Sequence, residues 1–460
     1  MFKKLIGDKR FYKHVLALML PIMVQNGITN FVNMLDNLMV GQVGQAEMTG
    51  VSIANQLLFV YNLCIFGAVS GAGIFGAQFF GSGDTKNLRN TFRFKLISCT
   101  LLTLGVIALF GFGGEGLINL YLKGEGSPET ARASLIAGKE YLYIMIIGLI
   151  PAALVQCYSS TLRETGKTVP PMIAGLVAVL VNLALNYILI FGHFGAPSLG
   201  VRGAAIATVI SRFVELGVVA LWTRIKSYEN TFIIGAYKSM HVPLFLVKNI
   251  CKKGIPLMVN ETMWAGGLAV VNQCYSGVSL EVVAANNLVQ IFFNVFSVAF
   301  IAVGAAIGII LGQLLGAGET EEAKSASVKL ISFSVFISIG VAILFGICAI
   351  FIPEFYKLDE STKVLATRMM QICALAVPLD AFANASYFTL RSGGEALVTI
   401  IFDSGFVWVI SVPVAFILCN LTSMSILPIY AICQGLNFIK CAIGFTFVKK
   451  GIWVKNIVSQ

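Results

Sequence analysis

The sequence is short of charged residues. Asp, Glu, Lys and Arg make up only 12% of its 460 residues, whereas hydrophobic residues make up 57%. A soluble globular domain carries roughly a quarter charged residues and about half apolar ones. The composition therefore excludes an ordinary soluble protein and indicates an integral membrane protein.

Other scarcities exclude particular kinds of site. The three histidines, His14, His193 and His241, lie far apart, so the sequence indicates no histidine metal cluster. None of the ten cysteines forms a Cys-x-x-Cys pair, and we interpret them as packing residues. Nothing matches a P-loop, which argues against ATP-driven transport within this chain. We predict that the protein is not an enzyme and has no cofactor and no nucleotide partner.

One glycine motif needs a separate interpretation. Residues 71–76 (GAGIFG) have the spacing of a dinucleotide-binding loop. That loop requires a preceding strand, and here the motif lies inside an apolar helix. We interpret these glycines as positions where helices pack closely.

Long apolar runs, in contrast, recur from end to end. Each contains at least 18 residues and is long enough to cross a hydrocarbon core about 30 Å thick as a helix. A β-barrel would instead show short alternating strands. The predicted fold class is therefore all-α. Hydropathy places twelve helices near residues 15–40, 52–80, 94–112, 139–161, 170–192, 201–223, 254–276, 283–313, 328–352, 369–390, 397–419 and 425–447.

The basic residues are distributed unevenly between the predicted loops. With a cytoplasmic N-terminus, 23 Lys and Arg residues fall on the cytoplasmic side and 7 outside, while Arg212 and Lys440 lie within helices. Lys and Arg accumulate in cytoplasmic loops, so we predict that both termini are cytoplasmic. This also accounts for the net charge of +10 without a nucleic-acid partner. The basic segment 1–13 has no cleavage site, and we expect no removable signal peptide.

The two halves of the chain repeat each other. Residues 20–23 (LPIM) recur 235 positions later at 255–258 (IPLM), and 76–84 (GAQFFGSGD) recurs at the same offset at 311–319 (LGQLLGAGE). Pro151 likewise matches Pro378, 227 positions later. An offset kept over separate motifs indicates an internal duplication.

The duplication predicts the domain organisation. Six helices per half give two pseudo-symmetric lobes related by an axis along the membrane normal. We place the N-lobe at residues 1–223, the C-lobe at 254–460, and a polar, basic cytoplasmic linker at 224–253. Two such lobes suit alternating access around a site near mid-membrane. The alternative is an ancient duplication without rocking motion.

Four carboxylates lie inside predicted helices: Asp36, Glu261, Asp380 and Asp403. An ionisable group there costs roughly 2.5 to 3.5 kcal/mol on insertion scales, so each is a functional candidate. Protonation and cation binding compete for a carboxylate deprived of water, as an ion-coupled antiporter requires. The alternative is a packing group bonded to a neighbouring amide or hydroxyl, and for Asp403 we favour this alternative.

Two more polar pairs lie within predicted helices. Asn182 and Asn186 are four residues apart and share one helical face. Their oxygens suit a hard cation and their amides suit a carboxylate, although they could equally join two helices. For Arg212 and Glu215, three residues apart, we favour mutual neutralisation.

These residues resemble the multidrug and toxic compound extrusion (MATE) family, in its NorM-like branch, within the multidrug/oligosaccharidyl-lipid/polysaccharide exporter superfamily. The resemblance covers essentially the whole chain. It rests on Leu20-Pro21 leading to residues 36–41 (DNLMVG), on the repeated motifs 76–84 and 311–319, and on 162–167 (LRETGK). It implies twelve transmembrane helices in two six-helix lobes that form a V-shaped central cleft.

The resemblance also implies an N-lobe site for coupling ion and substrate. Asp36 corresponds to the family's first-helix acid, and Asn182 and Asn186 correspond to a fifth-helix polar pair that joins it. Thr208 completes the site. Some members carry a carboxylate where this chain has Asn186, so the N-lobe site here is less negative.

A second site is implied in the C-lobe. Glu261 and Asp380 fit the seventh-helix and tenth-helix acids of the NorM-like branch. A sodium ion is thus expected either at Asp36, Asn182 and Asn186 or at Glu261 and Asp380. The resemblance leaves both Na⁺ and H⁺ open as the coupling ion.

The function implied is secondary active multidrug efflux: organic cations or drugs leave in exchange for Na⁺ or H⁺ by alternating access. The expected setting is the bacterial cytoplasmic membrane, with lipid around a monomer. One alternative is a lipid-linked oligosaccharide or lipid flippase, which would line its cleft with basic residues, whereas the intramembrane charges here lean acidic. The other is a non-transporting receptor or scaffold, which would need a sizeable soluble domain.

Overall fold

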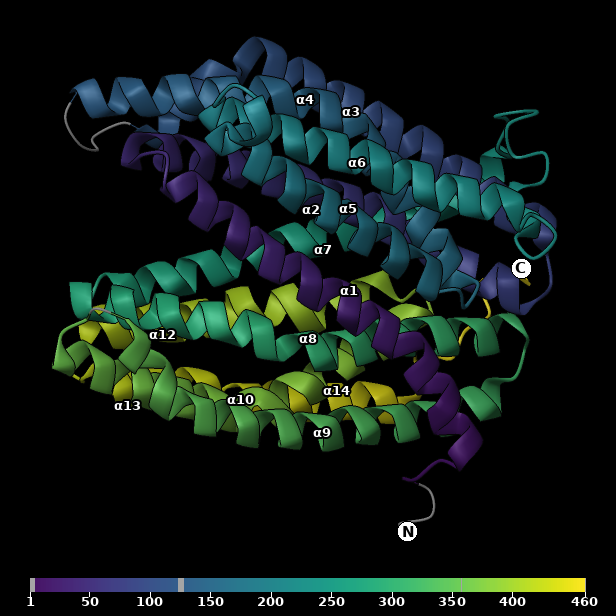
Figure 1. The fold of residues 1–460 in the computed structure, drawn as a ribbon. Helices are drawn as coiled ribbons and strands as arrows, with labels where there is room; N and C mark the ends of the chain where they lie inside the picture. The colour runs from purple at the N-terminus through teal and green to yellow at the C-terminus, as the bar shows by residue number, and fades with distance from the viewer. Residues whose placement is uncertain (1–4, 123–127, 357, 460) are drawn as a thin grey trace. The chain divides into compact units, whose positions relative to one another are not determined.

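The structure, a computed structural model, describes residues 5–122, 128–356 and 358–459. Every regular element in these ranges is helical, as predicted. The first six long helices are α1 (Lys9–Gly41), α2 (Gln45–Gly81), α3 (Thr85–Leu122), α4 (Pro128–Glu164), α5 (Val169–Phe191) and α6 (Gly200–Ile225) (Figure 1). The next four are α7 (Leu244–Ser276), α8 (Leu280–Gly316), α9 (Thr320–Phe351) and α10 (Glu360–Ser392). Short 3₁₀ turns occupy η2 (His193–Gly195), η3 (Thr231–Ile233) and η4 (Ile352–Phe355).

The last two long helices are interrupted. One runs through α11 (Ala396–Ile400), two π-helical turns, η5 (Ile401–Gly405) and η6 (Val407–Ser411), and α12 (Val412–Leu421). The other consists of α13 (Ile426–Gly435) and α14 (Asn437–Lys450). The described residues therefore form twelve long helices, which confirms the predicted number. Eleven of them contain a stretch long and apolar enough to cross a membrane.

Contacts divide the chain into two compact units. Unit 1 comprises Met1–Met23, Ala77–Gly83 and Cys251–Gln460, and unit 2 comprises Val24–Gly76 and Asp84–Ile250. The beginning of α1 and the end of α2 thus group with the C-terminal half of the chain. The predicted lobes share most of their residues with these units, and their boundaries stay a prediction.

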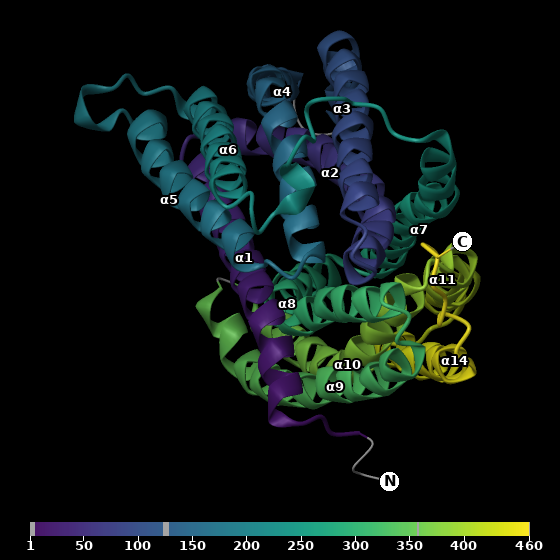
Figure 2. The same ribbon diagram turned by 90° about the vertical axis from the view of Figure 1, so that its right-hand side faces the viewer.

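In unit 1, α8, α9 and α10 lie side by side (Figure 2). Fully buried small residues such as Ala302 and Ala306 on α8 and Ala385 on α10 belong to one core cluster. Small side chains let helix backbones approach closely where lipid offers no hydrophobic drive for association. This packing fixes the position of α10, the helix that carries Asp380.

The predicted linker packs onto unit 2. Phe232 is buried with its ring 5.1 Å from that of Phe92 on α3. The Arg93 guanidinium donates to the carbonyls of Gly235 at 2.8 Å and Ala236 at 2.9 Å. Burial also raises the pKa of the Tyr237 phenol. Residues 226–250 are therefore a folded part of unit 2 and not a free tether.

The internal repeat is visible in the structure. Prolines lie inside the first and seventh long helices and inside the fourth and tenth, as the repeat predicts. The two glycine motifs also pack against each other within unit 1. A Cβ added to Gly81 would overlap the backbone of Gln313, and one added to Gly316 would overlap the backbone of Gln78. Glycine is thus required at both crossings.

Candidate functional site

Asp36 and three polar residues form a hydrogen-bonded chain inside unit 2. The Asn186 amide donates to Asp36 Oδ1 at 2.6 Å and to Asn182 Oδ1 at 3.2 Å. The Asn182 amide donates to Thr208 Oγ1 at 3.2 Å, and that hydroxyl donates to the Ala204 carbonyl. The structure therefore brings together all four residues predicted for this site, although their role in coupling stays a prediction.

Helix geometry explains this arrangement. Asn182 and Asn186 lie on one face of α5, four residues apart, and both are buried. Thr208 faces them from α6, because α5 and α6 pack against each other. Asp36 comes from α1 and is half-buried. Three helices thus converge on one polar cluster within an apolar surrounding.

One oxygen of this cluster has no partner. Asn186 Oδ1 is buried and accepts no hydrogen bond in the part of the chain that the structure describes. Buried polar atoms are nearly always satisfied, by protein, water or an ion. An unpaired carbonyl oxygen beside a carboxylate suits a small cation or a proton-bearing group, because hard cations prefer oxygen ligands.

A cation lies beside the cluster, together with an aromatic residue that the sequence did not single out. Arg212 on α6 interacts electrostatically with Asp36, but it is paired to Glu215 on its own helix at 2.7 Å. The predicted neutralisation of this pair is confirmed. Buried Tyr141 on α4 lies beside Thr208 and interacts electrostatically with Asp36. Spacing along the chain cannot reveal such a partner from a distant helix.

Glu261 has partners of its own in unit 1. The Tyr387 hydroxyl of α10 donates to Glu261 Oε1. The Arg391 guanidinium lies 3.6 Å from the same oxygen and 3.4 Å from the Tyr387 hydroxyl. Among the described residues, no hydrogen bond or ion pair joins Glu261 to Asp380. The structure therefore does not bring the two predicted C-lobe acids into direct contact.

Asp380 belongs to a neighbouring cluster that includes Asp403. The Asn437 amide donates to Asp380 Oδ1 at 2.7 Å. Lys440, one turn further along α14, donates to Asp403 Oδ1 at 2.8 Å and interacts electrostatically with Asp380. The Asn260 amide donates to the other oxygen of Asp403 at 3.1 Å. Asp403 is thus bonded to an amide, as predicted, but it is also paired with a lysine inside the protein, which was not predicted.

The charged residues inside the protein include bases as well as acids. The topology count treated Lys95, Arg163 and Arg391 as basic residues of cytoplasmic segments, whereas the structure places them within α3, α4 and α10. Lys95 and Arg391 are buried. Lys95, Arg391 and Lys440 each pair with an acid, namely Glu164, Glu261 and Asp403.

Lys95 and Glu164 form a buried ion pair that sequence reasoning missed. Lys95 Nζ lies 2.6 Å from Glu164 and also donates to Ser160 and Thr161, both at 3.1 Å. A Cβ on Gly73 would crowd this carboxylate, as would one on Gly76. Close helix packing around the GAGIFG motif is therefore confirmed, and here it accommodates a charged group.

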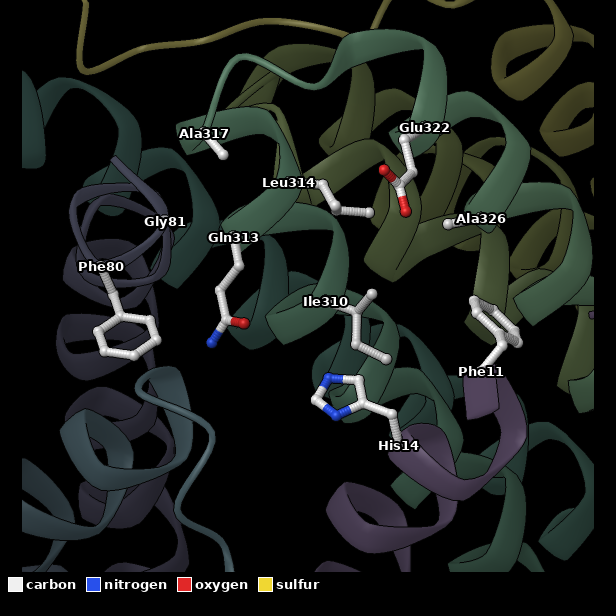
Figure 3. Close-up of a pocket in the computed structure, with 10 residues that line it drawn as sticks. All are labelled: Phe11, His14, Phe80, Gly81, Ile310, Gln313, Leu314, Ala317, Glu322 and Ala326. Atoms are coloured by element: carbon white, nitrogen blue, oxygen red, sulfur yellow. The ribbon is translucent and has the colours of Figure 1, made fainter. Parts of the chain in front are cut away.

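A pocket of about 360 Å³ lies elsewhere in unit 1 (Figure 3). His14, Gln313 and Glu322 point into it from α1, α8 and α9. None of the six predicted site residues is among the residues that line it. The candidate site therefore remains with the acids Asp36, Glu261 and Asp380, and not with this pocket.

Comparison with protein families and with curated proteins supports the resemblance seen in the sequence. The model of the family described as MatE matches residues 21–188 and 256–417. A protein of Thermotoga maritima named probable multidrug resistance protein NorM is 25% identical over 97% of this chain and 94% of its own length. The probable NorM of Bacillus cereus is 26% identical over 89% of this chain and 88% of its own. The predicted resemblance is confirmed.

Solved structures confirm the fold. A structure described as MATE in the straight conformation matches with a TM-score of 0.86 at 18% identity, over 97% of each chain. An outward-facing multidrug resistance MATE family transporter of the MOP superfamily matches with a TM-score of 0.84 at 18% identity, over 98% of each chain. At this identity the likeness concerns the fold alone.

Proposed function

We propose, from the premise that this chain belongs to the MatE family of multi-pass membrane transporters, that it exports organic cations or drugs in exchange for Na⁺ or H⁺. Its relatives in Thermotoga maritima and Bacillus cereus are named probable multidrug resistance proteins, which supports small-molecule substrates. The proposed setting is the bacterial cytoplasmic membrane, with both termini cytoplasmic.

The observation that carries the proposal is the Asp36 cluster. It combines one carboxylate, two amides and a hydroxyl inside a bundle of apolar helices, and one of its oxygens has no partner within the described residues. Burying a carboxylate among apolar helices costs free energy, and such residues usually have a functional role. A coupling ion or proton at Asp36 supplies the missing charge and uses the free oxygen.

The mechanism we propose is alternating access. Ion binding at Asp36 favours one orientation of the transporter, and substrate binding favours the other. Each ligand shifts this equilibrium only by the difference between its affinities for the two states. A substrate cation suits an apolar path with a few carboxylates and aromatic rings, through charge pairing and cation–π contacts.

The test measures ethidium efflux from proteoliposomes with imposed Na⁺ or H⁺ gradients. We expect gradient-dependent efflux from the wild type and a fall to background in Asp36→Asn, because the neutral amide cannot exchange a cation or proton. Glu140→Gln is the matched control, since it removes an exposed acid of the same unit. Glu261→Gln tests whether the second predicted acid takes part.

The gradient that drives efflux identifies the coupling ion. Efflux that persists in Asp36→Asn contradicts the role given to this carboxylate. No efflux under either gradient, from correctly inserted protein, contradicts drug antiport and favours the flippase alternative.

A further inference from the structure

The acids of unit 1 are already engaged by fixed partners. Asp403 accepts from the Lys440 ammonium with one oxygen and from the Asn260 amide with the other. Glu261 accepts from Tyr387 and lies beside Arg391. Unit 1 thus differs from the Asp36 cluster, where no ion pair to Asp36 exists among the described residues.

Lys440 sits in surroundings that suit a bound ammonium ion. Its Nζ lies 5.4 Å from the centre of the Phe402 ring and 6.0 Å from that of Phe406, within the range of cation–π attraction. Asp403 lies between these rings in sequence and is 2.8 Å away. Two aromatic faces and a carboxylate therefore surround one positive charge.

The local backbone is adapted to this contact. Asp403 lies in the π-helical turn η5, and the Ser404 amide nitrogen donates to Asn260 Oδ1 at 3.2 Å. A π-turn widens a helix by one residue and is common at functional sites. The widened turn and the side chain of buried Asn260 together hold Asp403 toward Lys440.

A sodium ion does not fit beside these groups. It needs several oxygen ligands in place of its water shell, and each oxygen of Asp403 already accepts a hydrogen bond, one from Lys440 and one from Asn260. A second positive charge next to the Lys440 ammonium would also be repelled. Within these clusters the three carboxylates, Glu261, Asp380 and Asp403, outnumber the two bases, Arg391 and Lys440, by one charge, which a single proton neutralises.

We propose that Lys440 is a built-in cation of unit 1: its ammonium occupies the position that a coupling sodium ion would take between Asp403 and Asp380. Unit 1 therefore binds no Na⁺, and any sodium site of this transporter is the Asp36 cluster. The inference refines the proposed antiport function, and it concerns the ion used by each unit.

The test measures saturable binding of radiolabelled Na⁺ to purified full-length protein, with choline chloride as the balancing salt. All variants carry Asp36→Asn, so that unit 2 does not contribute. The parent should show no saturable Na⁺ binding. Adding Lys440→Met should create one saturable site, because the vacated space faces Asp403 and Asp380. Lys440→Arg, which keeps the charge, should create none.

A third substitution assigns the new site. Asp403→Asn added to the Lys440→Met variant should abolish the gained binding. Should Lys440→Met fail to yield monodisperse protein, Lys440→Gln replaces it with the same expected gain, because it also removes the positive charge. Saturable Na⁺ binding by the parent that disappears on adding Glu261→Gln or Asp380→Asn overturns the proposal. So does a folded Lys440→Met or Lys440→Gln variant that binds no Na⁺.

The two proposals fail separately. A protein that exports no drug yet gains a Na⁺ site on loss of Lys440 refutes antiport and keeps the role of Lys440. A protein whose Asp36→Asn variant still exports drug in a Na⁺ gradient, with Na⁺ bound at the unit 1 acids, keeps antiport and refutes that role.

Discussion

Asp36 in unit 2 and Asp380 in unit 1 are held alike but have different neighbours. Each accepts a short hydrogen bond from an asparagine, Asn186 at 2.6 Å and Asn437 at 2.7 Å. Each also feels a nearby cation. Arg212 beside Asp36 is neutralised by Glu215 on its own helix, whereas Lys440 beside Asp380 reaches across to Asp403 on another helix.

The difference shows how a protein can leave one carboxylate free to bind a ligand while it pairs another with a fixed cation. Arg212 is paired with Glu215 on its own helix and forms no ion pair with Asp36 among the described residues, so the Asp36 carboxylate is open to an incoming ligand. A lysine that joins two acid-bearing helices becomes part of the cluster itself. An acid hydrogen-bonded to an asparagine can therefore bind an exchangeable ion in one unit, while in the other unit its charge is balanced by a lysine.

The largest effect should come from the pair that is most deeply buried. Lys95→Met leaves Glu164 without its ammonium inside unit 2, and breaking a buried ion pair costs about 3 to 5 kcal/mol. Reversible unfolding in mixed micelles would measure this loss. A loss near zero would mean that this ion pair is not needed for stability. Burial would then not explain why some acids of this protein are paired with cations and others are not.

The next effect depends on sodium. In the Asp36→Asn background, Lys440→Met should unfold more easily in choline chloride and regain stability in NaCl. Ligand at 100 times its dissociation constant stabilises the folded state by about 2.7 kcal/mol. The measurement is the thermal midpoint in each salt. The Asp36→Asn parent, with Lys440 in place, should show the same midpoint in both salts, and a sodium-induced rise in that parent would remove the distinction between the units.

A third substitution tests ion binding by the Asp36 cluster of unit 2. Asn186→Asp places a second carboxylate beside Asp36 and replaces an amide donor with oxygen ligands that a cation prefers. If Na⁺ is the coupling ion, half-maximal efflux should occur at roughly tenfold lower Na⁺, which corresponds to about 1.4 kcal/mol. An unchanged Na⁺ dependence would argue that Asp36 does not bind the ion. Asn437→Asp next to Asp380 is the matched change in unit 1 and should leave the Na⁺ dependence as it is.

The smallest effect should come from an exposed pair. Arg202 and Glu140 on unit 2 form a bidentate contact, but their side chains are 58% and 34% exposed. Exposed ion pairs contribute about 1 kcal/mol or less. Arg202→Ala should therefore shift the unfolding free energy by less than this amount. A larger loss would show that geometry matters more than burial for ion pairs in this protein.

Much of the fold follows from the sequence. Long apolar runs fix the number of helices, and the prolines and glycines of the repeat fix which helices correspond. Asn182 and Asn186 could be placed on one face because residues four apart on a helix always share a side. Asp36 stood out as a carboxylate inside an apolar helix, and the resemblance to a family then added Thr208. The structure brings both to the same cluster as the two asparagines.

The charge partners could not be predicted in this way. Lys440 lies 37 residues from Asp403, and Lys95 lies 69 residues from Glu164. Helical spacing rules reach only three or four residues, so they could identify the pair Arg212 and Glu215 but not these two. The count of basic residues assigned Lys95 to a cytoplasmic segment because it lies at the very start of the predicted helix 94–112, and hydropathy cannot tell whether such a side chain faces water or protein.

Gln78 carries a consequence for the order of assembly. Its side-chain amide donates to the Ser392 and Lys455 carbonyls, and its oxygen accepts from the Ile457 amide. The end of α2 therefore finds its partners only after nearly the whole chain has left the ribosome. Until then a fully buried position lacks its hydrogen bonds, and the native state of this helix end is reached after synthesis and not during it.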